Sequence, residues 1–432
     1  MRRPSGPLWS HRDFLKLWSG QTLSEFGSQV SQLAIPSVAI LTLKASAFQV
    51  AALGTVEFMP FLLLTLPAGV WVDRWRRRWI LIAGDFGRAV LLASIPIAYA
   101  FGHLTLAQLY VVGFAVGVLT VFFDVAYQSY LPQIVERETL IDANSKLQMT
   151  VSGAAMSGTG VSGALIGLVT APYAIVVDAC SFVLSGGFTA AIRKREELPP
   201  ATERRNLFVE LWEGLRYVTG HRLLFPQALS TGVSNFATNV GGSVLLVYAY
   251  RNLGLRPVLM GLIGVIAASG WLIGSATASR LRDKLGVNGA TILGASLAGP
   301  SALLVPFSPA GNWAIAFISA SGAIMGFGAV VYNIQQVSLR QAITPERLQG
   351  RMNASMRFFV WGTIPLGSLV GGTLASVFSV RTAIFVGAGL AFSSILPILL
   401  SPLRTVREFP EMEEMPLLHE AGLVGAPAAA ET

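Results

Sequence analysis

The densest group of charges in this chain lies between two long apolar segments. Residues 69–79 read GVWVDRWRRRW and hold one acid, Asp73, together with four arginines. A carboxylate can accept hydrogen bonds from the start of a neighbouring helix, and an arginine can pair with an acid on another helix. The chemistry that this group offers is therefore hydrogen bonding and ion pairing.

Polar side chains with helical spacing form a second chemical set, because they lie inside apolar segments. Such residues are costly in a membrane unless they face a cavity. One stripe consists of Gln21, Ser24, Glu25, Ser28 and Gln32. Another consists of Thr231, Ser234, Asn235 and Thr238. The two halves of the chain are similar in sequence at an offset of about 209 residues, and this offset places Glu25 opposite position 234, so the two stripes occupy equivalent places. The two stripes predict a polar cavity lined from both halves of the chain.

Glu25 is the leading candidate for binding a proton. It stands about eleven residues, roughly 16 Å along the helix, from the inner end of its segment. Glu57, in the next segment, is the second candidate, and it would favour proton binding at Glu25 further if the two side chains approach within a few ångströms. Proton coupling and a purely substrate-binding or hydrogen-bonding carboxyl both remain open for Glu25, whereas Asp178 is expected to be a structural hydrogen-bonding residue. The cavity is expected to lack a fixed positive charge, which favours cationic or neutral substrates.

The composition requires a membrane, because 53% of the 432 residues are hydrophobic and only 12% are charged. A helix crosses a bilayer in about 20 residues. The sequence holds twelve apolar segments of sufficient length, at 14–43, 47–71, 79–101, 104–130, 147–170, 172–192, 223–250, 258–280, 287–307, 312–338, 355–376 and 380–401.

The basic residues orient these segments. If the N-terminus is cytoplasmic, all but four of the 31 Lys and Arg lie on the inner side. We therefore expect a multi-pass protein of the inner (plasma) membrane with both termini in the cytoplasm. The net charge of +8 is explained by contact with the lipid bilayer and needs no nucleic acid.

The halves of the chain resemble each other, which predicts an all-α fold of two pseudo-symmetric six-helix bundles. The segment after Gly69 is echoed by GSATASRLRDKLG at 274–286, and VERETLIDANS at 135–145 by TPERLQGRMNAS at 344–355. The expected divisions are an N-terminal half at 1–192, a linker with an amphipathic surface helix at 193–222, a C-terminal half at 223–401 and a disordered acidic tail at 402–432.

Enzyme chemistry is not expected. The four histidines are scattered and form no ligand set, so neither a metal site nor a cofactor is predicted. The chain has no G-x-x-x-x-G-K-[ST] loop for ATP. The pattern GTGVSG at 158–163 lies inside an apolar segment without a preceding strand, and its small residues favour helix packing.

The motif GVWVDRWRRR, followed by Asp85 and Arg88, resembles the signature loop of the major facilitator superfamily. The resemblance covers roughly residues 12–402 and implies a gate latch between the inner ends of helices. The implied gating residues are Gly69, Asp73, Arg74, Arg77, Arg78, Asp85, Arg88 and Asp124. Asp124 is the acid expected to pair with Arg77, and Gln21, Ser28, Gln32, Thr231, Asn235 and Thr238 are expected to line the cavity.

The chain most resembles the bacterial branch that holds macrolide and siderophore exporters. The resemblance implies a monomeric, proton-driven exporter of small amphipathic compounds that works by alternating access. An uptake carrier for a small metabolite and a non-transporting receptor or scaffold are the alternatives. Thr159 stands where the antiporter motif of the fifth helix usually has proline, so a strict antiporter is not implied.

Overall fold

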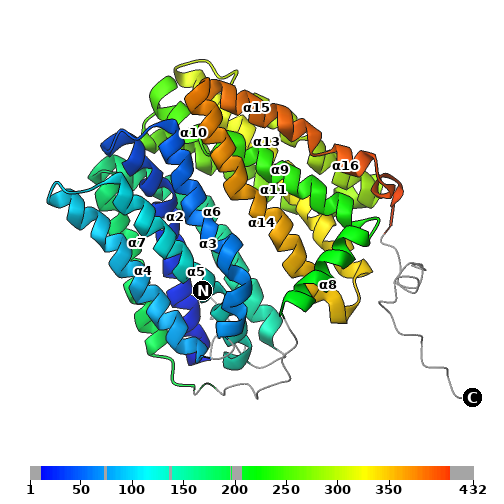
Figure 1. Cartoon of the computed structure of the whole chain (residues 1–432), viewed down its shortest axis with the longest axis horizontal. Coiled ribbons are helices and arrows are strands. Elements are labelled where there is room, and N and C mark those ends of the chain that lie inside the picture. The colour runs from blue at the N-terminus through cyan, green and yellow to red at the C-terminus, as the bar shows by residue number, and fades with distance from the viewer. Residues whose placement is uncertain (1–10, 73–74, 136–138, 195, 197–206, 409–432) are drawn as a thin grey trace, which may run out of the picture.

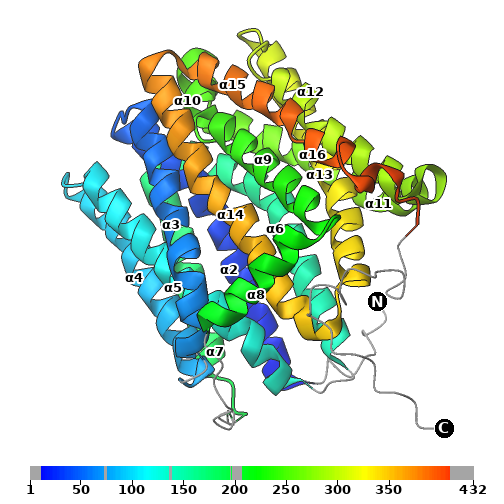
Figure 2. The same ribbon diagram turned by 45° about the vertical axis from the view of Figure 1, so that its right-hand side comes forward.

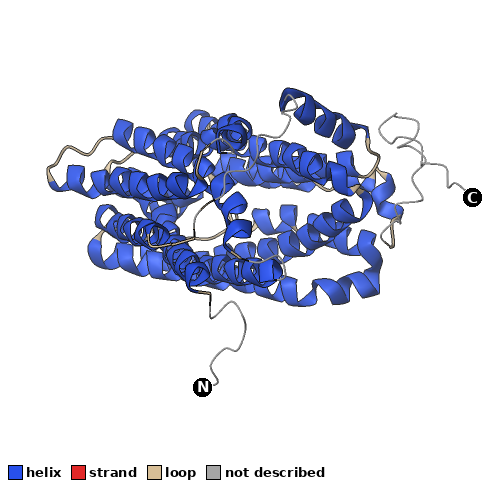
Figure 3. Ribbon diagram, turned by 90° about the horizontal axis from the view of Figure 1, so that it is seen from below, coloured by secondary structure: helices blue, strands red, loops and turns tan. Residues whose placement is uncertain are grey.

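The structure, a computed structural model, describes residues 11–72, 75–135, 139–194, 196 and 207–408. Within these residues every regular element is a helix (Figure 3). The first group comprises α2 (Arg12–Ser37) with its π-helical extension η1 (Val38–Thr42), α3 (Ala47–Val72), α4 (Arg77–Ala100), α5 (Leu106–Ile134), α6 (Leu140–Val169) and α7 (Ala171–Ala190). The second comprises α8 (Leu207–Gly220), α9 (Leu224–Gly242), α10 (Leu245–Val247), η3 (Tyr248–Asn252), α11 (Pro257–Ser296), α12 (Ala298–Leu303), α13 (Asn312–Ile343), α14 (Glu346–Val377), α15 (Val380–Ser393), α16 (Leu396–Leu399) and η4 (Pro402–Thr405).

Each group packs mainly on itself. In the first, α7 lies against α2 and α4, while α5 lies against α3 and α4; in the second, α13 lies against α11, and α14 and α15 lie against α9. Two pairs of helices, α3 with α14 and α6 with α11, join the groups. Figure 1 shows the first group on the left and most of the second on the right. The interface between them is therefore made by few helices.

Polar side chains determine where several helices begin. The imidazole Nδ1 of His11 accepts a hydrogen bond from the Phe14 amide at 3.1 Å at the start of α2. The Thr105 hydroxyl accepts one from the Gln108 amide at 3.3 Å at the start of α5. The first amides of a helix have no partner within it, so these bonds stabilise the turns that separate neighbouring spans.

Among the described residues, nine helical segments are long and apolar enough to cross a membrane. α2 and α9 are not among the nine, because they carry the two polar stripes. One segment, Pro257–Leu303, is 47 residues long, which is about 70 Å at 1.5 Å per residue. It bends at Gly286, whose φ of 75° interrupts the helix. That length suffices for the two passes that the sequence predicts there.

The two groups are in contact at the end remote from α8, which we call the far end. There a side chain on Gly163 of α6 would place its Cβ 2.7 Å from the Cα of Gly261 in α11, so the backbones touch. The hydroxyls of Ser37 and Tyr250 share a hydrogen bond at 2.9 Å. Arg251 donates to the Ala45 carbonyl at 2.6 Å. Backbone and side-chain contacts together close the far end.

Contacts between α3 and α14 continue from the far end to the middle of the molecule. A Cβ on Gly372 would lie 2.6 Å from that of Ala51, and the rings of Phe61 and Trp361 meet edge to face with centroids 5.4 Å apart. Beyond this point the groups diverge toward the end where α2 begins and α8 lies, which we call the linker end (Figures 1 and 2). The molecule is thus closed at the far end and opens toward the linker end.

The predicted linker helix is confirmed as a helix, and part of it is buried. α8 packs against α14 and α9, with Tyr217 and Val218 buried among them, while Trp212 is exposed. The C-terminal turn of α8 therefore belongs to the core of the second group, which the sequence analysis did not predict, while the position of the helix at the membrane surface stays a prediction.

The boundary of the predicted disordered tail also needs correction. Residues 402–405 form a 3-10 helix, and the carbonyls of Val406 and Arg407 accept hydrogen bonds from Asn288 and Val287 at 2.9 Å. The bend at Gly286 leaves these two amides without helical partners, which explains why the chain packs there. The rest of the predicted tail, from 409 on, lies outside the described residues.

The contact between Gly163 and Gly261 predicts how the far end can be forced open. Gly163→Val should disfavour far-end closure by about 2 kcal/mol, roughly a thirtyfold change in the balance, because an added side chain must displace a backbone. Spin labels on Ser46→Cys and Arg256→Cys, in a Cys180→Ser background, would show a new population at longer distance.

Gly153→Val is the matched control, since it lies in the same helix and a Cβ there meets no atom within 4 Å. Identical distance distributions in both variants would show that the glycine contact does not hold the far end closed.

Candidate functional site

The charged loop between α3 and α4 is only partly described. Gly69 lies near the end of α3, while Asp73 and Arg74 lie outside the described residues. The amides of Arg77 and Arg78 donate to the two carboxylate oxygens of Glu196 at 2.7 and 3.1 Å. Glu196 therefore caps the start of α4, where an acid also interacts favourably with the helix dipole.

The predicted pairing of Arg77 with Asp124 was wrong. The guanidinium of Arg77 lies 4.0 Å from Glu196 instead. The sequence analysis ended this segment at residue 130, but α5 continues to Ile134. Asp124 therefore stands ten residues, about 15 Å along the helix, from the end of α5. Arg78 donates to the Ala190 carbonyl at 2.6 Å, which links the start of α4 to the end of α7.

Asp85 and Arg88 form a buried ion pair inside the first group. Their side chains are 2.6 Å apart, one helical turn apart in α4, and both are buried. The guanidinium carbon of Arg88 lies 4.2 Å from the ring centre of Phe123 and 4.1 Å from that of Phe182, so two aromatic faces enclose it. The resemblance implied a gating role at the inner helix ends, but this pair lies well inside the bundle.

Three further carboxyl groups lie within electrostatic reach of Arg88. They are Glu25 of α2, Asp124 of α5 and Asp178 of α7. Glu25 is half-buried and accepts a hydrogen bond from the Gln21 side chain at 2.9 Å. Four acids including Asp85 thus lie within reach of Arg88, and with Arg357 near Asp124 the acids still outnumber the arginines, which favours proton or cation binding.

Asp178 is a hydrogen-bonding residue, as predicted. It is buried, and its Oδ1 accepts a hydrogen bond from the Ser181 hydroxyl at 3.2 Å within α7, while Ser31 and Ser28 of α2 lie close to it. Ser28 of the first polar stripe thus lies beside Asp178, whereas Gln32 is exposed.

Asp124 of α5 and Arg357 of α14 interact electrostatically from the two groups of helices. Both side chains are exposed, and each lies within electrostatic reach of the other. Arg357 also lies over the Trp361 ring, 5.7 Å from its centre. The expectation that no fixed positive charge lies deep in a span was wrong, because Arg88 and Arg357 each lie eleven residues inside their helices.

Glu57 occupies a different place from Glu25. It lies in a pocket of about 180 Å³ toward the far end, which is also lined by Asn239 of α9 and by Ser243, the residue that follows this helix. Its Oε1 is buried and has no hydrogen-bond partner among the described residues. Glu57 packs against Gly113 of α5, where a Cβ would lie 2.9 Å from its Cγ.

The second polar stripe lines a pocket of about 430 Å³ within the second group. Thr231 shares a hydrogen bond with the Tyr332 hydroxyl at 2.8 Å and accepts one from the Gln336 amide at 3.0 Å. Asn235 donates to the Val360 carbonyl at 2.9 Å, whereas Thr238 is half-buried and lies outside the pocket lining.

The sequence analysis missed the side of this pocket that α13 and α14 provide. Tyr332, Asn333 and Gln336 lie on α13, and the Trp361 ring lies on α14. The polar run YNIQQ at 332–336, inside an otherwise apolar segment, was a signal that could have identified α13.

Thr159, which stands where the antiporter motif usually has proline, packs at the junction of α6 and α11. If Gly264 of α11 carried a Cβ atom, that atom would lie 2.8 Å from the Thr159 side chain. A Cβ atom on Gly261 would lie 2.8 Å from the Thr159 carbonyl oxygen. The residue therefore belongs to the contact that closes the far end.

Comparisons with known proteins identify transporters. An uncharacterized MFS-type transporter of Bacillus subtilis, YvqJ, is 23% identical over 363 residues, 82% of this chain and 84% of the relative. The multidrug efflux pump Tap of Mycolicibacterium fortuitum is 26% identical over 365 residues, 81% of this chain and 86% of the pump. These relatives are membrane transporters and not enzymes.

A solved structure has the same fold. The crystal structure of a bacterial homologue of the iron transporter ferroportin, in an inward-facing state, aligns with a TM-score of 0.73 at 18% identity over 90% of this chain and 98% of that one. The family profile described as Major Facilitator Superfamily matches residues 17–363, well over half of the sequence. The chain therefore belongs to the Major Facilitator Superfamily, a family of multi-pass membrane transporters of small molecules.

Proposed function

We propose that the protein exports small amphipathic compounds, cationic or neutral, by exchange for protons across the inner membrane. The observation that carries this proposal is the arrangement across the gap: an excess of acids around Arg88 on one side and a neutral, polar and aromatic pocket on the other. The efflux pump Tap, a relative at 26% identity, supports the direction of transport.

The proposed topology has twelve passes with both termini in the cytoplasm. The nine apolar segments become twelve when α2, α9 and a second pass within Pro257–Leu303 are added. The bias of basic residues supports a cytoplasmic linker end. The shape, closed at the far end and open at the linker end, would then be the inward-facing state of an alternating-access cycle.

The pocket of the second group is the proposed substrate site. Tyr332, Asn333 and Gln336 offer hydrogen-bonding groups, while Trp361 offers an aromatic face for an apolar or cationic group. A volume of about 430 Å³ suits a small molecule, and ligand pockets commonly combine apolar walls with a few polar groups.

Glu25 is the proposed proton carrier. It lies on the first group between the Arg88 cluster and the Gln21 side chain, and it is half-buried rather than sealed in the core. A carboxyl group in this position can take a proton on one side of the membrane and release it after the cavity faces the other. Asp85, which is fully enclosed and paired with Arg88, is less suited to this exchange.

The direct test of function is accumulation of a fluorescent hydrophobic cation. Cells that overproduce the protein should hold severalfold less dye than cells with the empty vector, and a protonophore should abolish the difference. Inside-out vesicles would confirm the direction of transport. Equal accumulation with and without the protein, or a difference that survives the protonophore, contradicts proton-driven export.

Glu25→Gln tests the coupling residue, because it imitates the protonated side chain and keeps its shape. In proteoliposomes the variant should still exchange labelled substrate at equilibrium but should lose at least about tenfold of its concentrative transport, the loss expected when a proton carrier is removed. Glu57→Gln, which changes the carboxyl in the pocket toward the far end, is the matched control. If Glu25→Gln transports uphill with the pH dependence of the wild type, Glu25 is not the carrier.

Asp124 and Arg357 are the proposed closing pair at the linker side of the cavity. In a Cys180→Ser background, Asp124→Cys and Arg357→Cys should form a disulfide on oxidation, since closure must bring their Cα atoms within about 6 Å. The crosslink should stop transport, and a reductant should restore it.

Asp124→Cys with Asn353→Cys, one turn earlier in α14, is the control and should crosslink much less. If the cysteines at 124 and 357 do not crosslink during transport while those at 124 and 353 do, Asp124 and Arg357 are not the closing pair, and α5 meets α14 one helical turn away.

A further inference from the structure

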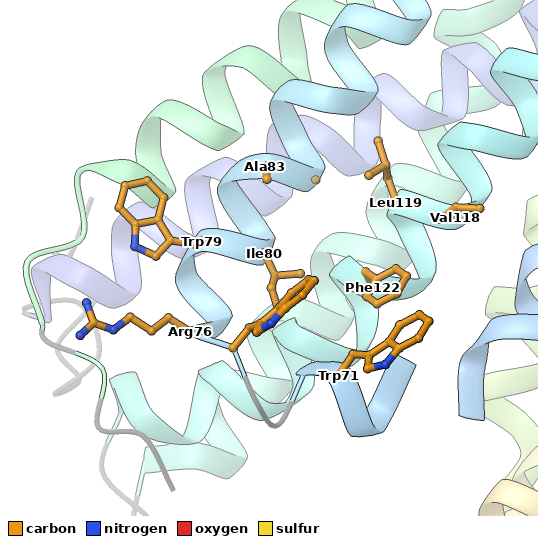
Figure 4. A pocket seen from close by; sticks show the side chains of 10 residues that line it. Trp71, Arg76, Trp79, Ile80, Ala83, Val118, Leu119 and Phe122 are labelled. Atoms are coloured by element: carbon orange, nitrogen blue, oxygen red, sulfur yellow. The ribbon is translucent and has the colours of Figure 1, made fainter. Parts of the chain in front are cut away.

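A groove of about 740 Å³ lies on the first group at the linker end, apart from both pockets described above. It runs between the end of α3, the start of α4 and the middle of α5. Its lining includes Trp71, Trp75, Arg76, Trp79, Leu119 and Phe122. Figure 4 shows Trp71 beside Phe122 on the α3 and α5 side, and Arg76 beside Trp79 at the start of α4.

The walls of the groove are preformed. The rings of Trp71 and Phe122 stack at 5.7 Å with an angle of only 3° between them, so an aromatic wall exists without a ligand. On the opposite wall α4 presents the small residues Ala83 and Gly84 toward Leu119. Because Ala83 and Gly84 are small, they leave an apolar slot along the surface of α4 beside Leu119 that can hold an alkyl chain.

The mouth of the groove carries hydrogen-bond donors. Trp71, Trp75 and Trp79 have exposed fractions of 44, 61 and 62%, and their indole N–H groups make no hydrogen bond within the described part of the chain. Arg76 is also exposed and forms no ion pair with a described residue. A cation and several N–H donors next to an apolar slot match a phosphate group joined to an acyl chain.

The depth of the groove identifies the source of such a molecule. It lies where an apolar helix surface meets a charged loop, the level at which tryptophan is enriched in membrane proteins. No other described helix covers α4 and α5 here, so this surface faces the lipid bilayer. We propose that the groove binds an anionic phospholipid, with its phosphate at Arg76 and one acyl chain in the groove along Ala83 and Leu119.

Brominated lipids test this site, because bromine on an acyl chain quenches tryptophan on contact. The purified full-length protein would be placed in vesicles of unlabelled phosphatidylcholine that contain either brominated phosphatidylglycerol or brominated phosphatidylcholine with the same acyl chains. We expect an enrichment of the anionic lipid of about fivefold, the effect of one basic residue near an anionic surface. Arg76→Gln should abolish this preference, and Ala83→Phe should reduce quenching by both lipids because it fills the slot.

Arg280→Gln is the matched control, since Arg280 is an exposed arginine in α11 toward the same end of the molecule. It should keep the preference for the anionic lipid. Equal quenching by the two lipids in the wild type, a preference that survives Arg76→Gln, or an equal loss in Arg280→Gln would each overturn the proposal. Displacement of the brominated lipid by a transported dye would assign the groove to substrate instead, and the transport assays above would separate that outcome from failure of the proposed function.

Discussion

The buried guanidinium of Arg88 constrains the whole first group of helices. An arginine keeps its charge in a protein, and a buried charge is stable only with a partner. Asp85 supplies that partner from the same helix at 2.6 Å, while Phe123 of α5 and Phe182 of α7 cover the two faces of the guanidinium. α4, α5 and α7 must therefore keep a fixed relation to each other, so the first group is expected to move as a unit.

The two groups differ in what they place beside the gap. The first presents carboxyl groups that compete for one arginine, with Glu25 and Asp124 as the members that are not fully buried. The second presents neutral hydrogen-bonding groups: the Thr231 hydroxyl is hydrogen-bonded to both Tyr332 and Gln336. In the proposed transport cycle the first group would handle charge and the second the substrate, although both derive from similar halves of sequence.

Much of this arrangement could be predicted from the sequence because it depends on local periodicity. The stripes that contain Glu25 and Asn235 follow the helical period, and the signature motif indicated the family before any comparison. The partner of Arg77 could not be predicted, because it depends on how far α5 continues and on Glu196, which is 119 residues away in sequence. Arg88 was visible, but counting charges assigned it to the inner side with the loop arginines, and only packing shows that it is buried. Glu57 and Glu25 lie in adjacent helices, yet adjacency does not determine which face each side chain takes.

The contact that closes the far end differs in kind from the one that would close the linker end. At the far end Gly163 and Gly261 bring backbones into contact, and such van der Waals contact is short-ranged and independent of protonation. Toward the linker end the interacting residues are Asp124 and Arg357, whose attraction depends on charge and extends over several ångströms. Binding of a proton or a cation among the acids near Arg88 would therefore alter the closing force at the linker end and leave that at the far end unchanged. In the proposed mechanism this asymmetry is what allows a change of charge in the cavity to select which end of the transporter opens.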